Sequence, residues 1–187
     1  FLEFINNILL KYCEVINLDN GTDYRAVYRN NLHKRYFVGN KNNREEIKKI
    51  IANLTKSQPL KSRKLKVWGR EVKIKKTFEK IAVIDFDDIC RENLATADYQ
   101  AICQEFNLIF LLKLPIFNKE QDRNEMRRFT LFIDEVYENK TALIILAKTK
   151  IDKIYSDSAL DPAYARTISR LNEIKSDEYW LSSKFIK

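Results

Sequence analysis

Leu108-Ile-Phe-Leu-Leu-Lys-Leu114 forms a nearly continuous apolar run that stops at Pro115. A second run, Thr141-Ala-Leu-Ile-Ile-Leu-Ala147, has the same character, and residues 122–139 between the two runs show helical periodicity. Apolar strands that do not alternate with polar residues are buried on both faces, and a helix between two of them is typical of a parallel sheet. The sequence therefore predicts an α/β fold with mainly parallel strands covered by helices.

The rest of the chain is divided into further elements by Gly, Asn, Asp and Pro signals. Downstream, the periodicity predicts a final helix over residues 163–179. Upstream, we expect helices over 1–11, 44–54 and about 96–106, the last capped by Thr96 or Asp98, strands over 14–18 and 81–86, and a linker over 56–63. Period-two alternation on either side of Trp68-Gly69-Arg70 predicts a β-hairpin with strands 64–68 and 71–75. Its apolar face would consist of Leu65, Val67, Val72 and Ile74.

Composition indicates a globular protein. With 187 residues, 45% hydrophobic and 12% aromatic, the chain can bury a sizeable core, and only 3 Gly and 3 Pro favour regular elements over loops. No apolar run approaches the ~20 residues of a membrane span, and the start carries no signal-peptide pattern, so we expect a cytoplasmic protein. The chain starts within a helical pattern and without an initiator Met, which we interpret as the C-terminal part of a longer polypeptide.

Cysteine and histidine offer little chemistry. Cys13, Cys90 and Cys103 are odd in number and lack metal-type or redox-type spacing, so we expect reduced thiols, mostly in the core. His33 is the only histidine, and no nucleophile motif accompanies it, which favours a surface histidine over a hydrolase residue.

Charge is concentrated in one segment. Residues 56–76 contain nine Lys or Arg and the single acid Glu71, whereas the remaining 25 basic and 25 acidic residues cancel, so this segment accounts for the whole net charge of +8. On a hairpin, one face would carry Lys64, Lys66, Lys73 and Lys75. Facing like charges destabilise a hairpin unless an anion binds there, and nucleic acid or an anionic membrane fits, with Trp68 available for stacking or interfacial anchoring. The alternative is a solvated edge hairpin whose lysines prevent aggregation.

The final helix carries an unusual pair of cations. Arg166 and Arg170 lie one turn apart, together with Glu173, on the face opposite a predicted buried stripe of Tyr164, Ile168 and Leu171. Although the chain has 22 Lys and 12 Arg, this face uses only arginine, whose planar fork suits phosphate and carboxylate. Two interpretations stay open: a solvated helix face with Glu173 as its internal partner, or a site for an anion.

Thr130-Leu-Phe-Ile-Asp-Glu135 looks at first like a Walker B strand, in which acids follow an apolar run. Met126, Phe129 and Ile133 recur at helical spacing, however, and Arg127-Arg128 precedes the segment without a strand boundary, so we expect a core helix instead. The sequence also contains no Gly-x-x-x-x-Gly-Lys-Ser/Thr loop to cradle phosphates. The chain alone is therefore not expected to hydrolyse ATP.

Several motifs in a fixed order carry a family resemblance: Val15-Ile-Asn-Leu-Asp19 with Asp23-Tyr-Arg25, Val67-Trp-Gly-Arg70, Phe86-Asp-Asp-Ile-Cys90 with Ala97-Asp-Tyr99, Arg127-Arg-Phe129 with Ile133-Asp134, and Arg166-Thr-Ile-Ser-Arg-Leu171. Together they resemble the C-terminal half of the ZapE family of P-loop ATPases, an AAA+-like group that includes the mitochondrial ATPase-family-gene-one proteins. The resemblance spans nearly the whole chain. Departures from the family pattern occur at Ala95, Asn107, Ile174 and Leu146-Ala147.

The resemblance implies the C-terminal part of a P-loop NTPase-type (AAA+-like) fold with a basic hairpin insertion. Residues 1–55 would end the nucleotide-binding core, 56–80 would be the basic linker and hairpin, and 81–187 a family-specific α/β region. ATP and Mg²⁺ would be bound mainly by an upstream part, with no catalytic residue in this chain. The expected protein is a homo-oligomer that remodels or regulates a protein partner, in bacterial cell division or mitochondrial protein quality control, cytoplasmic or peripheral to a membrane.

In that setting Arg166 and Arg170 are the first candidates for nucleotide sensing or subunit contact, and Arg25, Arg127 and Arg128 are the second. The alternative for each arginine is a bridge to a carboxylate on another helix. Residues 108–147 resemble the strand-helix-strand unit that carries Walker B in such ATPases, but the first strand ends in Lys113-Leu114 rather than acids, so a degenerate copy could not hold magnesium. The alternative function is a non-enzymatic module that binds nucleic acid or an anionic surface through the hairpin.

Overall fold

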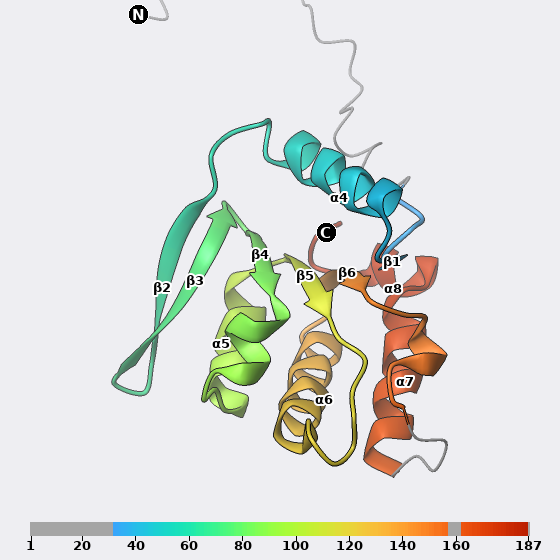
Figure 1. Ribbon diagram of the computed structural model, residues 1–187. Coiled ribbons are helices and arrows are strands. Elements are labelled where there is room, and N and C mark those ends of the chain that lie inside the picture. Colours follow the sequence, from blue (N-terminus) through green and yellow to red (C-terminus); the bar gives the residue numbers. More distant parts are fainter. Residues whose placement is uncertain (1–31, 157–161, 187) are drawn as a thin grey trace, which may run out of the picture.

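The computed structural model describes residues 32–156 and 162–186 of the chain. They form a six-stranded sheet in the order β1-β6-β5-β4-β3-β2 (Figure 1). The strands are β1 Tyr36–Val38, β2 Lys61–Val67, β3 Arg70–Phe78, β4 Ile81–Asp85, β5 Leu108–Leu114 and β6 Ala142–Ala147. Strands β1, β6, β5 and β4 are parallel, whereas β3 and β2 are antiparallel to their neighbours. The predicted α/β fold with mainly parallel strands is confirmed.

Helices cover both faces of this sheet. They are α4 Lys41–Leu54, α5 Thr96–Glu105, α6 Arg123–Glu138, α7 Pro162–Ile174 and α8 Asp177–Ser182, with a short π-helix at Asp87–Arg91 and a 3-10 turn at Ile151–Lys153. Figure 1 shows α5, α6 and α7 side by side on one face and α4 on the other. The hairpin of β2 and β3 extends to one side of the sheet, next to α5 (Figure 1).

The central strands are buried on both faces, as their continuous apolar sequence requires. Alternate residues of β5 point in opposite directions, so Ile109 and Leu111 join the core under α5 and α6. Phe110 packs on the other side with Ile47 and Ile50 of α4. Each of these side chains is at most 5% exposed, and such burial stabilises the fold by roughly 1.5–3 kcal/mol per residue.

Helix α6 contains the segment that resembled a Walker B strand. Met126, Phe129, Ile133 and Val136 are all buried on its inner side, which explains the helical spacing in the sequence. Asp122 occupies the N-cap position and accepts a hydrogen bond from the backbone N–H of Asn118. The interpretation of residues 130–135 as a core helix is confirmed.

The predicted hairpin is present and longer than expected. Strand β2 begins at Lys61, inside the predicted linker, and β3 continues to Phe78. Trp68 and Gly69 both have positive φ, 45° and 83°, as in a type I′ turn, whose twist matches that of the strands. Val67, Val72 and Ile74 are buried and Leu65 is half-buried, so the predicted apolar face is confirmed.

Two predicted boundaries were wrong. Helix α4 begins at Lys41 rather than residue 44, because the Asn40 side chain caps it by accepting the backbone N–H of Asn43. The single helix predicted over 163–179 is two helices, because the Ser176 side chain accepts the backbone N–H of Tyr179 and starts α8. Strand β1 was not predicted.

The start of α5 and the cysteines were also predicted from the sequence. The N-cap of α5 is Ala95, so the prediction that Thr96 or Asp98 occupies this position was wrong; Asp98 lies three residues further on and accepts the backbone N–H of Ala95. Cys90 and Cys103 are buried free thiols, as expected, and burial raises the pKa of Cys103 to about 12. Cys13 and the elements predicted over 1–11 and 14–18 lie outside the described residues.

The division of the chain into three functional segments, 1–55, 56–80 and 81–187, stays a prediction. The described parts of all three segments contribute strands to the same sheet. Strand β1, from the first segment, pairs with β6 of the third, and α4 packs on the same sheet. Within the described part of the chain, no helix combines the length and the hydropathy that crossing a membrane requires.

Candidate functional site: arginines between α6 and α7

Helix α7 presents the two arginines to α6 rather than to solvent alone. Thr167, Leu171 and Ile174 are its buried side chains, whereas Tyr164 and Ile168 of the predicted stripe are half-buried. The Thr167 hydroxyl lies 3.0 Å from the Thr130 hydroxyl of α6. The helix is therefore turned so that its arginine face lies along the contact with α6.

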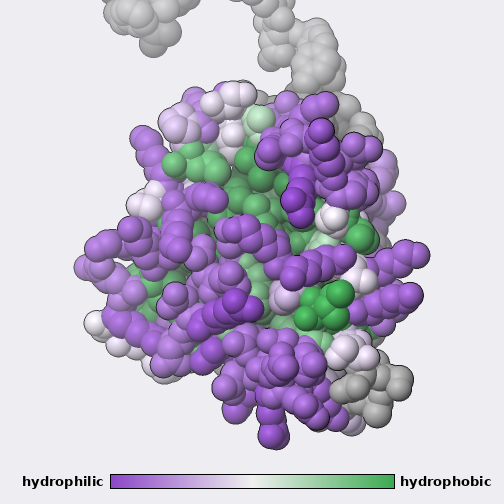
Figure 2. Space-filling model, viewed as in Figure 1, coloured by the Kyte–Doolittle hydropathy of each residue, from purple (hydrophilic) through white to green (hydrophobic). Residues whose placement is uncertain are grey.

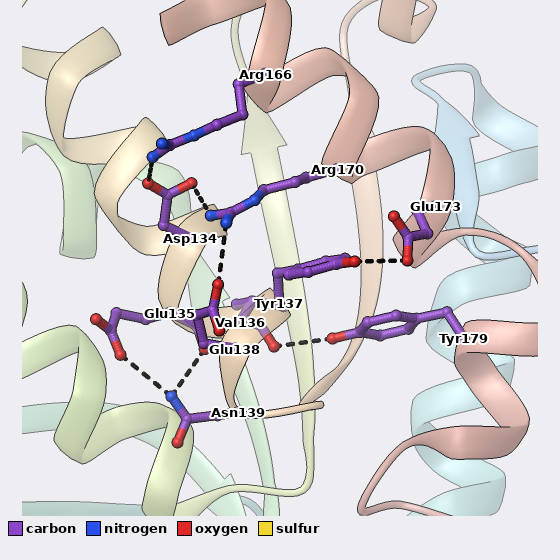
Figure 3. A network of polar contacts seen from close by, with 10 residues as sticks. All are labelled: Asp134, Glu135, Val136, Tyr137, Glu138, Asn139, Arg166, Arg170, Glu173 and Tyr179. Atoms are coloured by element: carbon purple, nitrogen blue, oxygen red, sulfur yellow. Dashed lines mark hydrogen bonds and ion pairs between the residues drawn. The ribbon is translucent and has the colours of Figure 1, made fainter.

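Asp134 of α6 is the shared partner of both arginines. One carboxylate oxygen accepts from Arg166 and the other from Arg170 (Figure 3). Arg170 also donates to Glu138, with 3.0 Å between Nη2 and Oε1. Each helix places two like charges one turn apart, and the two pairs are complementary across the contact. The alternative in which these arginines bridge carboxylates between helices is thus what the structure contains.

The two arginines differ in exposure. The Arg170 side chain is 18% exposed, and its guanidinium lies 4.9 Å from the centre of the Tyr137 ring. The Arg166 side chain is 57% exposed. Arg170 is therefore held by two carboxylates and an aromatic ring, whereas Arg166 lies at the rim and can leave Asp134 without leaving that carboxylate unpaired.

Glu173 is not the internal partner of the arginines, so that prediction was wrong. It accepts a hydrogen bond of 2.7 Å from the Tyr137 hydroxyl, which raises the pKa of Tyr137 (Figure 3). Nearby, the Tyr179 hydroxyl donates to the backbone oxygen of Val136 at 2.8 Å, and burial raises the pKa of Tyr179. Both tyrosines therefore stay protonated donors and fix α6 to α7 and α8.

A hollow of 540 Å³ adjoins this network, and we call it the arginine hollow. Its charged lining consists of Arg123, Arg127, Arg166 and Asp134. Arg127 is exposed, and no ion pair joins it to any residue within 32–156 or 162–186. Three cations against one carboxylate that is already paired make the hollow suitable for an anion that carries several oxygens, such as a phosphate.

The remaining arginine candidates lie elsewhere. Arg128 points to the π-helix, where it donates to the backbone oxygen of Cys90 at 3.2 Å. It is therefore not part of the arginine hollow. Arg25 lies outside the described residues.

The arginine hollow does not fit a magnesium ion. Both oxygens of Asp134 accept from guanidinium groups, which compete with any metal for them. Over the described ranges, no group of three His, Cys, Asp or Glu side chains is arranged to hold a metal ion. Any Mg²⁺ that accompanies ATP would need ligands from another part of the protein.

The lysine face of the hairpin is partly neutralised. Lys64 lies opposite Lys73, as predicted, but donates to Glu71 at 2.7 Å, and this hydrogen bond raises the pKa of Lys64. Lys75 donates to Asp88 at 2.5 Å. These contacts lessen the repulsion that first suggested an anionic partner.

Other cations of the hairpin keep their exposure. Lys66 and Lys73 are exposed, and neither forms an ion pair with a residue that the structure describes. Trp68 is 93% exposed at the tip of the hairpin. A tryptophan in that position is available for stacking or interfacial contact, which keeps the binding hypothesis open.

Two buried charges were not predicted from the sequence. The Arg35 side chain is 1% exposed, donates to Asp177 at 2.8 Å, and lies 4.7 Å from the centre of the Trp180 ring. Asp98 is fully buried and pairs with Arg70, the arginine of the Trp-Gly-Arg turn. Neither partner could be found from local spacing, because 142 and 28 residues separate the pairs.

A profile of the family described as AFG1-like ATPase matches residues 1–182. The chain belongs to this family. Its sequence is 26% identical to the cell division protein ZapE of Escherichia coli strain K12 over 169 residues, 90% of this chain and 45% of that protein. It is also 24% identical to lactation elevated protein 1 homolog B of Danio rerio, over 97% of this chain and 43% of that protein.

The chain thus spans less than half the length of these relatives. An uncharacterized protein of Schizosaccharomyces pombe is similar as well, 24% identical over 91% of this chain and 44% of its own length. A search of solved structures found no significant match to the chain. The resemblance drawn from the motifs is confirmed at the level of the AFG1-like ATPase family.

Proposed function

We propose that this chain is the C-terminal portion of an ATP hydrolase of the AFG1-like family. The observation that carries the proposal is the family match, which extends over residues 1–182 and so includes both the sheet and the arginine hollow. ATP and Mg²⁺ would be bound mainly by an upstream P-loop region. The chain itself would supply contacts to that region or to a neighbouring subunit of a homo-oligomer.

Within this proposal Arg127 and Arg166 are the residues that meet the anion. Their side chains line one hollow, and both are exposed, so neither needs to leave a buried ion pair in order to contact a phosphate. Guanidinium groups that reach a transferring phosphoryl group stabilise the charge of the transition state. Arg170 would keep α6 and α7 together rather than contact nucleotide.

The test is ATP hydrolysis by the full-length protein that includes the upstream P-loop. Arg127→Ala and Arg166→Ala are each expected to lower kcat by about 10²–10³, the loss found when one such donor is removed. Arg91→Ala is the matched control, because Arg91 is an exposed arginine whose one ion pair among the described residues is with Asp87 of its own helical turn. An unchanged kcat in both Arg127→Ala and Arg166→Ala would refute the role of these two arginines. The ATPase proposal itself fails only if the full-length protein does not hydrolyse ATP.

We infer the biological setting from the relatives. One relative is named a cell division protein, so remodelling or regulation of a division protein in a bacterial cytoplasm is one setting. Mitochondrial protein quality control, with peripheral membrane contact, is the other setting for a family with eukaryotic relatives. Affinity capture with the full-length protein in the presence of ATP would identify the partner protein.

A second candidate function rests on the exposed tip of the hairpin. Trp68 at 93% exposure, with Lys66 and Lys73 on the adjoining face, suits a nucleic acid or an anionic membrane. Binding to single-stranded DNA, RNA or anionic vesicles would weaken as salt rises, and Trp68→Ala would weaken it further. Absence of binding at low salt would refute this function.

A further inference from the structure

A second hollow opens on the opposite face of the sheet. It has a volume of 460 Å³ and lies between α4 and the carboxyl ends of β5 and β6. We call it the α4 groove, and its floor is formed by Ile47, Ile51, Leu112 and Leu146. Figure 2 shows hydrophobic surface between the hydrophilic side chains of α4 and those over the strands. This surface is apolar and open in the described part of the chain.

The α4 groove lies where the topology of the sheet opens a crevice. Strands β1 and β6 are parallel neighbours, but the chain leaves β1 for α4 on one face and leaves β6 for α7 on the other. In open α/β sheets, ligands bind outside the carboxyl ends of strands at such a switch point. Gly39 lines the groove there, and its backbone N–H donates to the Ala147 oxygen at 2.7 Å. A Cβ at this position would lie 3.2 Å from that oxygen, so glycine lets the two strand ends approach closely.

The charge of the α4 groove has one sign. Its charged lining within the described residues consists of four cations and no acid: Arg44, Lys48, Lys113 and Lys148. Lys48 pairs with Glu45 and Lys113 with Asp85, both outside the lining. Arg44 and Lys148 form no ion pair with any residue the structure describes. Cations beside an apolar floor complement a ligand that has an apolar body and an anionic end.

Lys113 marks the site in a second way. It has φ of 63°, an uncommon conformation for a residue other than glycine, where the register of β5 with β6 shifts between Leu111 and Leu114. Such bulges redirect a side chain and are over-represented near binding sites. Here the bulge places a lysine at the carboxyl end of a central strand, beside the groove.

The size and the floor of the α4 groove select the kind of ligand. A volume of 460 Å³ lies in the range of small-molecule sites, roughly 300–1,000 Å³. Within the described residues its lining contains no aromatic ring to stack on a base, and the half-buried Leu54 and Leu60 extend the same apolar cluster. We propose that the α4 groove binds a single-chain amphiphilic anion, an aliphatic chain that ends in a phosphate or carboxylate. This site is independent of ATP hydrolysis.

The first test uses a series of monomeric alkyl phosphates with the 187-residue chain, measured by isothermal titration calorimetry. From butyl to hexyl to octyl phosphate, the affinity should rise about fourfold per methylene, the factor that corresponds to burial of one CH₂ group. Inorganic phosphate should bind at least about 100-fold more weakly than octyl phosphate, and octyltrimethylammonium at least about tenfold more weakly. An affinity independent of chain length, or equal binding of the cationic amphiphile, would overturn the proposal. Displacement of octyl phosphate by AMP at equal concentration would overturn it as well.

The second test places the ligand in the groove. Arg44→Glu and Lys148→Glu should each weaken octyl phosphate binding at least about tenfold and leave the chain-length dependence intact. Lys49→Glu is the matched control, because Lys49 is an exposed lysine on the side of α4 away from Ile47. Equal weakening by the control variant would show general charge attraction and overturn the site. The alkyl series with the unmodified chain decides the question even if a variant fails to fold.

Discussion

Replacement of Asp134 by alanine should destabilise the chain more than the loss of any exposed ion pair. Asp134 is 17% exposed and accepts from two guanidinium groups, of which Arg170 is itself only 18% exposed. Exposed pairs contribute about 0.2–1 kcal/mol, whereas hydrogen bonds to charged groups in less exposed positions contribute about 1.5–3 kcal/mol. We therefore expect Asp134→Ala to lower the free energy of unfolding by about 2 kcal/mol, or Tm by about 4–8 °C in a chain of this size.

A double-mutant cycle assigns this energy to one arginine. Urea denaturation of the 187-residue chain with Asp134→Ala and Arg170→Ala, singly and together, should give a coupling of about 1.5 kcal/mol. The same cycle with Arg166 should give at most about 0.5 kcal/mol, because that side chain is 57% exposed. Glu120→Ala, which removes an exposed acid in the loop before α6, is the control for charge alone. Equal coupling of the two arginines to Asp134 would refute the distinction between a structural and an available arginine.

Further outcomes follow from other parts of the structure. Trp68→Asn should raise the free energy of unfolding by about 0.5–1 kcal/mol, because asparagine suits the positive φ of 45° at this turn position. A lower Tm of the variant in a thermal melt would contradict this and indicate that the tryptophan packs on the chain. Cys90 and Cys103 should react with a thiol reagent at about pH 8 only as fast as the chain unfolds, since burial raises the pKa of both thiols. Peptide mapping that finds either of these two residues labelled rapidly in the native protein would contradict their burial. Asp177→Asn should destabilise the chain at neutral pH, because the hydrogen bond from Arg35 lowers the pKa of Asp177 in the folded state. The contribution of this carboxylate to folding stability is present above the ordinary pKa of the carboxyl and is lost as pH falls through the lower folded pKa. The stability difference from the parent chain should therefore shrink in acid, and a difference that grows there would have the wrong sign.

The parts of the fold that could be predicted are those with a local signal. The strand predicted over residues 108–114 coincides with β5, because a buried strand that begins after Asn107 and ends before Pro115 is marked by its own apolar run. Strand β1 has three residues, too few to show a period, and it exists only because β6 offers a parallel edge. The break between α7 and α8 depends on Ser176, whose capping hydrogen bond competes with a helical pattern that continues through it.

The candidate site was predictable by residue type but not by partner. The spacing of Arg166 and Arg170 marks a face that needs a counter-charge. The counter-charge is on α6, where Asp134 lies 32 residues from Arg166 and Glu138 lies 32 residues from Arg170. Only the packing of α7 on α6 brings them together, and the spacing within one helix does not show which other helix it contacts. Asp134 and Glu138 have the same one-turn spacing as the arginines, so a comparison of spacings between helices is the signal that could have suggested this pairing.

The energetics of the network limit which arginine can respond to nucleotide. For Arg170 to reach a phosphate, it would have to leave Asp134, Glu138 and the Tyr137 ring, and Asp134 would then lose its less exposed partner. Breaking such contacts costs about 2–4 kcal/mol, which would weaken the response by roughly 30- to 800-fold before any gain from the phosphate. Arg127 has no such contact to leave within the described residues, and Arg166 leaves only a shared carboxylate that Arg170 still neutralises. Under the proposed function, we therefore assign a sensing role on this surface to Arg127 and Arg166, and a structural role to Arg170.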